Sequence, residues 1–172
     1  METLKTLKTR RSCRAYKPER VEAEKIDAIV EAGTYAATGM GKQSPIIIVV
    51  KDQEVRDKLS KMNAEIMGVD FDPFYGAQDL LIVLANKDVP TYIYDGSLVM
   101  GNLMNAAADL GVSSCWIHRA KEEFESEYGK ELLKKWGLPE SYRGVGNCIL
   151  GYAAGPAAEP KPRKENYVYY AE

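Results

Sequence analysis

Two short stretches of the chain, residues 46–50 and 80–85, are apolar without interruption. The first consists entirely of β-branched side chains and the second is aliphatic throughout. Runs of this length and composition are typical of strands that are buried on both faces. We therefore predict a sheet that is covered on both sides.

Helical periodicity fills much of the rest of the chain. Residues 21–37 and 54–67 repeat apolar positions at helical spacing, and each segment is predicted to be a helix with one buried face. Residues 95–110 form a third predicted helix, capped by Asp95 or Ser97. Because this helix is apolar on all sides, we expect it in a core or a subunit interface. The remaining pattern predicts strands at 112–117 and 145–152 and an exposed amphipathic helix at 121–136.

The length and composition of the chain indicate one domain. It has 172 residues, of which 45% are hydrophobic, enough for one core and few for two. We expect a single domain over 1–172, in which 156–172 is a C-terminal arm rich in Pro, Lys and Tyr. The tyrosines at 167–170 are unfavourable in water, so this arm is expected to pack as a strand or arm, with a partner subunit as one candidate surface.

The overall charge excludes two classes of partner. A formal net charge of −2 provides no general basic surface for nucleic acid or for an anionic membrane. Residues 1–10 contain no apolar core of signal-peptide length, and no apolar run is long enough to span a bilayer. We therefore expect a cytoplasmic protein.

Cysteine and histidine content argues against a disulfide framework or a zinc site. Cys13, Cys115 and Cys148 are odd in number and widely spaced, so reduced and mostly buried thiols are expected. His118 is the only histidine, which excludes a multi-histidine metal site. Cys115 stands three residues before it, so a Cys–His pair stays open as a minor alternative to a histidine without a catalytic role.

Basic residues cluster near both ends of the chain. Arg10, Arg11 and Arg14 surround Ser12 within five residues, and a second cluster follows at 161–164 with the sequence Lys-Pro-Arg-Lys. The rigid guanidinium fork can engage two oxygens of one phosphate, whereas lysine acts as a point charge. The two ends could therefore close on one phosphate of a cofactor. A solvated basic turn is the alternative interpretation of the first cluster.

Five motifs occur in an order that matches a known family. They are Arg-Arg-Ser-x-Arg at 10–14, Thr38–Pro45, the 95–110 helix, Gly-Val-Ser-Ser-Cys-Trp-Ile at 111–117, and Ile-Leu-Gly-Tyr at 149–152 with the later basic cluster. Together they extend over nearly the whole chain, which resembles the short branch of the nitroreductase family. The resemblance implies an α+β fold with a central, mostly antiparallel sheet flanked by helices. It also implies an intertwined homodimer with FMN in its interface.

The resemblance further implies which residues contact FMN. Arg10, Ser12 and Arg14 match positions that contact the phosphate, ribityl chain or pyrimidine edge, with Arg11 alongside. Lys161 and Arg163 would close on the phosphate from the C-terminal arm. Thr38 and Gln43 match a stretch that approaches the isoalloxazine, partly from the other subunit. The residues that match the strand end facing its reactive edge are Ser114, Cys115, His118 and Arg119.

The implied activity is that of an FMN-dependent NAD(P)H oxidoreductase. NADH or NADPH would reduce FMN at N5, and an electron-poor small molecule such as a nitroaromatic or quinone would then enter the same space. Arg14 would stabilise the charge of the reduced flavin, and backbone N–H groups around His118 would poise N5; no side chain is required as a catalytic acid or base. Because many relatives have glycine or an acidic residue at position 118, we expect His118 to affect acceptor choice. A flavin-binding sensor or carrier without efficient NAD(P)H turnover stays open as an alternative.

Overall fold

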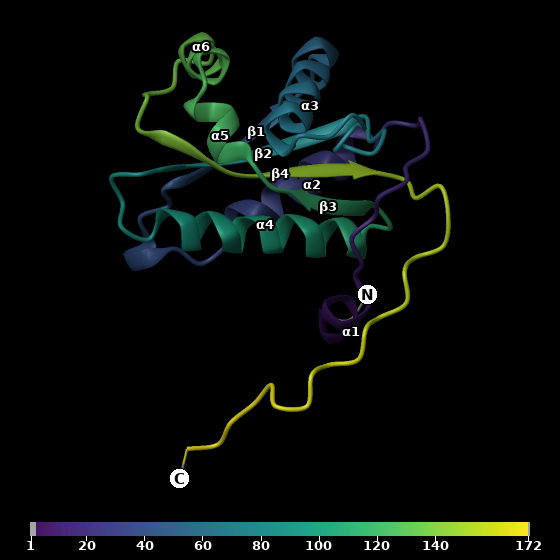
Figure 1. Ribbon diagram of the computed structural model, residues 1–172. Helices are drawn as coiled ribbons and strands as arrows, with labels where there is room; N and C mark the ends of the chain where they lie inside the picture. The colour runs from purple at the N-terminus through teal and green to yellow at the C-terminus, as the bar shows by residue number, and fades with distance from the viewer. Residues whose placement is uncertain (1–2, 172) are drawn as a thin grey trace.

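A four-stranded antiparallel sheet forms the centre of the computed structural model, which describes residues 3–171 (Figure 1). The strand order is β1-β2-β4-β3, and each neighbouring pair is antiparallel. This confirms the predicted sheet. The bounds are β1 Pro45–Val50, β2 Asp79–Asn86, β3 Ser113–Ile117 and β4 Tyr142–Gly151.

Burial differs between the two strands that were predicted to be covered on both faces. From Leu80 to Ala85, β2 is at most 1% exposed, because it lies inside the sheet with helices on both sides. The edge strand β1 has one neighbour, and its Val49 is 36% exposed. The prediction of burial on both faces is therefore correct for residues 80–85. It is wrong for residues 46–50, because one side of β1 has no neighbouring strand within this chain.

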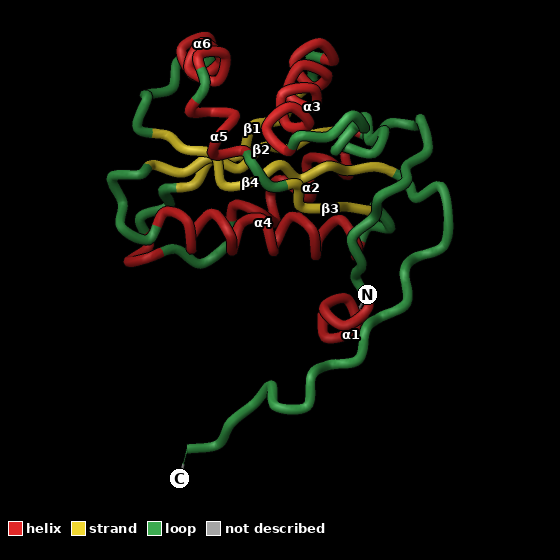
Figure 2. The backbone as a smooth tube through the Cα atoms, in the orientation of Figure 1, coloured by secondary structure: helices red, strands yellow, loops and turns green. Residues whose placement is uncertain are grey.

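Helices cover both faces of the sheet (Figures 1 and 2). One layer contains α2 and α4, whose apolar side chains form a core with one face of β2 and β4. The opposite layer contains α3, α5 and α6, which form a second core with the other face. The bounds are α1 Thr3–Thr9, α2 Ala23–Thr34, η1 Gly39–Gly41 (a short 3-10 turn), α3 Gln53–Met67, α4 Tyr92–Asp109, α5 Ala120–Glu125 and α6 Glu127–Lys135.

The helix predicted to start at Asp95 begins one turn earlier, so its predicted caps are wrong. The Asp95 carboxylate is 3% exposed and accepts hydrogen bonds from the Gly39 N–H at 2.9 Å and the Thr91 hydroxyl at 2.8 Å. It therefore ties the Gly39 turn to α4 instead of capping the helix. The Ser97 hydroxyl donates to the carbonyl of Ile93 within the helix.

The single helix predicted at 121–136 is two helices separated by Ser126. The backbone of Ser126 is extended, with φ −72° and ψ 163°, and its hydroxyl oxygen accepts the Gly129 N–H at 3.0 Å. Serine is a favoured N-cap because its side chain satisfies an N–H that the first turn leaves unpaired. The two helices run in different directions (Figure 1), and α5 packs on β4.

The C-terminal arm is extended and exposed. From residue 156 onward, the described chain contains neither helix nor strand and runs away from the sheet (Figure 1). Tyr167, Tyr169 and Tyr170 are between 66% and 89% exposed, so the expected strand is not formed within this chain; Glu172 lies outside the described residues. None of the helices described has both the length and the apolar character needed to cross a membrane.

Candidate functional site

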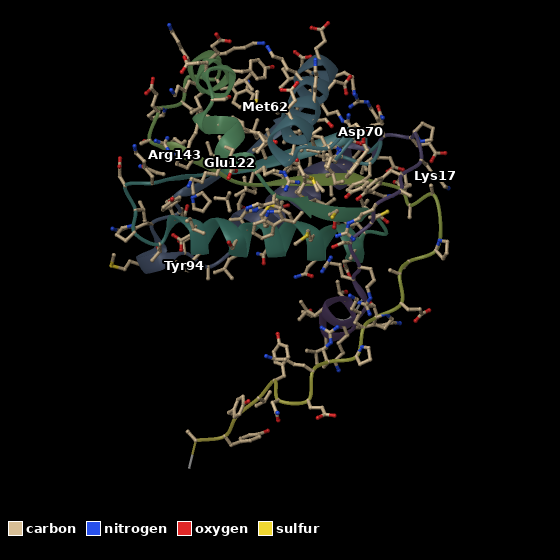
Figure 3. All side chains as sticks on the ribbon, in the orientation of Figure 1. Lys17, Met62, Asp70, Tyr94, Glu122 and Arg143 are labelled. Atoms are coloured by element: carbon tan, nitrogen blue, oxygen red, sulfur yellow. The ribbon has the colours of Figure 1, made fainter. Side chains whose placement is uncertain are left out.

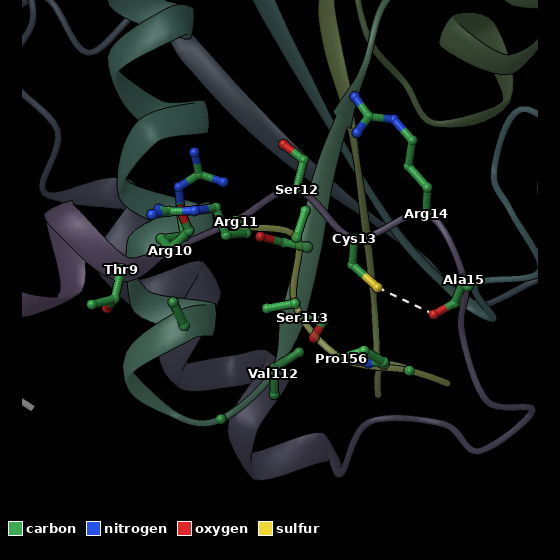
Figure 4. A pocket seen from close by; sticks show the side chains of 17 residues that line it. Thr9, Arg10, Arg11, Ser12, Cys13, Arg14, Ala15, Val112, Ser113 and Pro156 are labelled. Carbon is green, nitrogen blue, oxygen red and sulfur yellow. Dashed lines mark hydrogen bonds between the residues drawn. The ribbon is translucent and has the colours of Figure 1, made fainter. Parts of the chain in front are cut away.

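Residues 10–14, called the arginine segment from here on, lie along the free edge of β3. Ser12 forms a parallel bridge with Ser114, and the Cys13 N–H donates to the Ser114 carbonyl at 3.0 Å. Because the segment and β3 run in the same direction, Arg10 lies toward the start of the strand and Arg14 farther along it. Figure 4 shows Arg10 and Arg11 on one side of Ser12 and Arg14 on the other.

The chain that follows β4 pairs with the residues immediately after the arginines. Lys17 N–H donates to the Tyr152 carbonyl at 2.8 Å, and Ala154 N–H donates to the Ala15 carbonyl at 2.9 Å. Tyr16 and Ala153 form an antiparallel bridge between these two contacts. The C-terminal arm therefore begins beside the arginine segment, which brings the two ends of the chain together.

A cavity of about 530 Å³ lies between the arginine segment, the start of β3 and the start of the arm. Two buried polar atoms in its wall, Nη1 of Arg10 and Oγ of Ser114, have no hydrogen-bond partner in the protein. An unpaired buried donor costs about 1–3 kcal/mol, so such groups in native proteins normally have a partner. Cationic and hydroxyl side chains around one cavity fit an anionic, oxygen-rich ligand.

A second hollow, of about 840 Å³, joins the two basic clusters. Arg10, Arg11 and Ser12 line it from the N-terminal side, and Lys161 and Arg163 from the arm, together with the acidic Glu159. The guanidinium of Arg11 already donates to the Lys8 and Arg10 carbonyls, at 2.9 and 2.8 Å, and so it shapes the local backbone. Four of the cations in the two basic clusters therefore line one hollow, while Arg14 lies outside it.

Thr38 and Gln43 lie elsewhere within this chain. They line a separate cavity of about 300 Å³ between α2, β1 and Val99 of α4. Their positions are locked locally, because the Gln43 N–H donates to the Thr38 hydroxyl at 3.1 Å and Gln43 adopts a left-handed φ of 49°. One chain therefore does not unite these two residues with the arginine site.

His118 and Arg119 follow the opposite end of β3. The strand rises about 3.3 Å per residue, which places His118 roughly 13 Å beyond Ser114. His118 is exposed, and Arg119 has a left-handed backbone with φ 79°. We call the His118–Arg119 turn the 118–119 corner. A single ligand in contact with both the arginine segment and this corner must lie extended along β3.

The buried thiols of β3 and β4 offer no nucleophile. Cys115 is 2% exposed, and burial raises the pKa of its thiol, an effect that the nearby Arg14 charge partly offsets. The pKa of Cys148 is raised to about 12 by burial. The thiolate is the reactive form, so both groups are poor nucleophiles at neutral pH. Among the residues described, no cluster of three His, Cys, Asp or Glu side chains could hold a metal.

A buried carboxyl group behind the 118–119 corner was missed by the sequence reasoning. Glu123 is 0% exposed, and burial raises the pKa of its carboxyl to about 7 against the lowering effect of hydrogen bonds from Asn147 and Asn63. The sequence placed Glu123 in an exposed helix among other charged residues. The one available signal is the adjacent Phe124, which shares the buried face of α5.

Comparison with known proteins gives a consistent result. The model of the Nitroreductase family matches residues 7–70. An inferred NADH dehydrogenase/NAD(P)H nitroreductase of Archaeoglobus fulgidus is 30% identical over 171 residues, covering 96% of this chain and 90% of that protein. An FMN reductase (NAD(P)H) of Bacillus subtilis is 25% identical, over 94% of this chain and 70% of its own length. A crystal structure of a nitroreductase with bound FMN from Bacteroides fragilis has a TM-score of 0.90 at 27% identity, with 100% of both chains covered.

Proposed function

Because this chain belongs to the nitroreductase family, we propose that it is an FMN-dependent NAD(P)H oxidoreductase that reduces an electron-poor small molecule of the nitroaromatic or quinone class. One observation carries the proposal for its site. The two basic chain ends converge on cavities whose walls contain the unpaired buried donors of Arg10 and Ser114. A phosphate-bearing cofactor supplies the acceptors that these donors lack.

The residues fit FMN in the order in which they lie along β3. Arg10 and Ser12 line the cavity at the start of β3, and together with Lys161 and Arg163 they line the adjoining hollow, where the phosphate would be held. At an effective dielectric constant of about 20, one cation gains roughly 4 kcal/mol against a unit negative charge 4 Å away, before desolvation is subtracted. Several cations around one dianion can therefore hold the cofactor without a covalent bond.

Bound FMN supplies the redox chemistry, accepting a hydride at N5 from NADH or NADPH and passing electrons to the second substrate in a ping-pong sequence. Arg14, farther along β3 than Arg10, provides positive charge for the pyrimidine edge. Fixed charge aimed at developing negative charge lowers the barrier, because no solvent needs to reorganise around it. The exposed His118, at the far end of the strand, would contact the acceptor and influence its choice.

A second copy of the chain completes the site in this proposal. Ile93, Tyr94 and Leu98 on α4 are between 49% and 72% exposed, and Tyr94 projects from the outer side of that helix (Figure 3). Burying this apolar surface against another subunit would remove it from water. It would also allow Thr38 and Gln43 of one chain to approach the flavin held by its partner. Sedimentation analysis tests this point, and a monomer with bound flavin would contradict it.

The test combines binding with reduction. FMN is titrated into the wild-type protein, Arg10→Ala and the Arg10→Ala/Arg14→Ala double variant, and the visible spectrum is recorded. Each charge-assisted contact is worth about 1.5–3 kcal/mol, so loss of Arg10 should weaken binding at least tenfold. Arg143→Ala, which removes an arginine paired with Glu125 at the opposite end of β4 from the strand-pairing partner of Ser114, should bind normally. Full flavin occupancy in the double variant would contradict the assignment of the site.

Anaerobic stopped-flow mixing with NADH and with NADPH then tests the activity. The flavin absorption should bleach rapidly with at least one of the two donors. Tight FMN binding without reduction by either nucleotide would identify a flavin-binding sensor or carrier instead of a reductase.

A further inference from the structure

The peptide that joins His118 to Arg119 is held from behind by one buried side chain. Asn63 of α3 is 0% exposed, and its Nδ2 donates to the His118 carbonyl at 2.8 Å. Its Oδ1 accepts from Nε of Arg119 at 3.0 Å. Both ends of the Asn63 amide are therefore used on the same peptide corner, and rotation of that amide would place like groups against each other.

Glu123 fixes the orientation of Asn63. Asn63 Nδ2 also donates to Oε1 of Glu123 at 2.5 Å, and Asn147 Nδ2 donates to Oε2 at 2.8 Å. The backbone N–H of Glu123 donates to the Arg119 carbonyl at 3.0 Å. The carboxyl group thus contacts the corner through Asn63, while the start of α5 contacts it through the backbone.

The surroundings of Glu123 favour its neutral form. The side chains that face it from α3 and β4 are the amides of Asn63 and Asn147, while the charged groups are Arg119, which lowers its pKa, and Glu122, which raises it. Oδ1 of Asn147 is buried and has no partner. That oxygen can accept the O–H of a protonated carboxyl once the Asn147 amide is turned.

The geometry of the corner decides which group it presents outward. In a trans peptide the carbonyl and the following N–H point in opposite directions. Because Asn63 holds the His118 carbonyl inward, the Arg119 N–H points away from α3. Arg119 keeps a left-handed φ of 79°, a conformation that costs a residue other than glycine roughly 1–2 kcal/mol and persists where surrounding contacts impose it.

We propose that Asn63 and Glu123 form a buried clamp that orients the His118–Arg119 peptide, so that the Arg119 N–H is the donor presented to the reactive edge of the flavin. The two residues are positioning residues, since they act through the peptide and touch neither substrate nor cofactor. This proposal rests on the proposed function, because it needs FMN to lie along β3.

The midpoint potential of bound FMN is the measurement that tests the clamp. An N–H directed at N5 stabilises the oxidised flavin, because N5 is an acceptor only before reduction. Asn63→Ala should therefore raise the potential, and a tenfold loss of preference for the oxidised form corresponds to about 30 mV for two electrons. Affinity for oxidised FMN should fall by the same factor of about ten, while affinity for reduced FMN stays unchanged, because only the oxidised flavin loses this contact.

Matched variants separate orientation from general stability. Glu123→Gln keeps the shape and a neutral group, so it should retain the wild-type potential, whereas Glu123→Ala should raise it as Asn63→Ala does. Asn102→Ala removes another amide that donates to a backbone carbonyl, that of Ala32 at 3.0 Å, and should leave the potential unchanged. If Asn63→Ala does not fold, Asn63→Leu keeps the side-chain volume, removes the donor to the His118 carbonyl, and should raise the potential.

An unchanged potential in folded, FMN-loaded Asn63→Ala or Asn63→Leu would overturn the clamp while the proposed function stands. A wild-type protein that binds no FMN would overturn the proposed function and the clamp together. A raised potential in Asn63→Ala with wild-type behaviour in Glu123→Gln and Asn102→Ala supports the clamp.

Discussion

Replacing Glu123 by glutamine tests whether a fully buried carboxyl group makes the stability of this protein depend on pH. Two asparagine amides donate to the carboxyl, and no lysine or arginine forms an ion pair with it among the residues described. Desolvation is therefore the dominant influence and disfavours the charged form. Glutamine has nearly the same shape and stays neutral at every pH, so it removes the titration and retains the packing.

The magnitude follows from the difference between the folded and unfolded pKa values. Burial raises the pKa from an ordinary 4.5 to about 7, and at 1.36 kcal/mol per unit this is equivalent to roughly 3 kcal/mol. Below pH 4.5 the carboxyl is protonated in both states. Between pH 4.5 and 7 the folded protein binds more protons than the unfolded chain, so its stability falls as pH rises. Above pH 7 the full loss has occurred.

Urea unfolding at several pH values between 4 and 8.5 measures this effect, with wild type and Glu123→Gln prepared at the same flavin loading. All other groups titrate alike in the two proteins, so the wild-type free energy of unfolding should fall relative to the variant by roughly 3 kcal/mol across this range. Glu131→Gln, which removes an exposed carboxylate on α6, should show no such trend. A wild-type-to-variant difference that stays constant with pH would refute the reasoning.

Three further predictions concern other parts of the chain. Ser126→Ala removes the cap of α6 and should lower the free energy of unfolding by about 1 kcal/mol, measured by urea denaturation. Deletion of residues 156–172 removes the two arm cations from the basic hollow and should weaken FMN binding at least tenfold in a fluorescence titration, since about 1.4 kcal/mol is enough for that change; unchanged affinity would show that the arm does not hold FMN. Under native conditions a thiol reagent should modify the half-buried Cys13 well before Cys115 and Cys148, whose burial raises their pKa, and mass spectrometry of timed samples would reveal a different order.

Much of the fold was predictable because its signals are local. The continuous aliphatic run at 80–85 identified the central strand, and helical periodicity identified α2, α3 and α4 to within a few residues at most ends. The errors in helix boundaries fall at Asp95 and Ser126, two residue types that are equally suited to capping and to other hydrogen bonds. Asp95 instead binds the N–H of Gly39, 56 residues away, and Ser126 does cap, inside what was predicted to be one helix. Which role such a residue takes depends on partners that the local pattern does not contain.

For the candidate site, the sequence by itself determined the kind of ligand that could be bound. Three arginines around Ser12 and a second basic cluster near the C-terminus have phosphate-binding chemistry wherever they lie, and the order of five motifs indicated the family. Only the tertiary structure decided that these clusters share a hollow, that Thr38 and Gln43 lie apart from them within one chain, and that Glu123 is buried behind the 118–119 corner. The physical reason is that charge and hydrogen-bonding capacity belong to each residue, whereas burial, pKa and backbone strain arise from neighbours far away in the sequence.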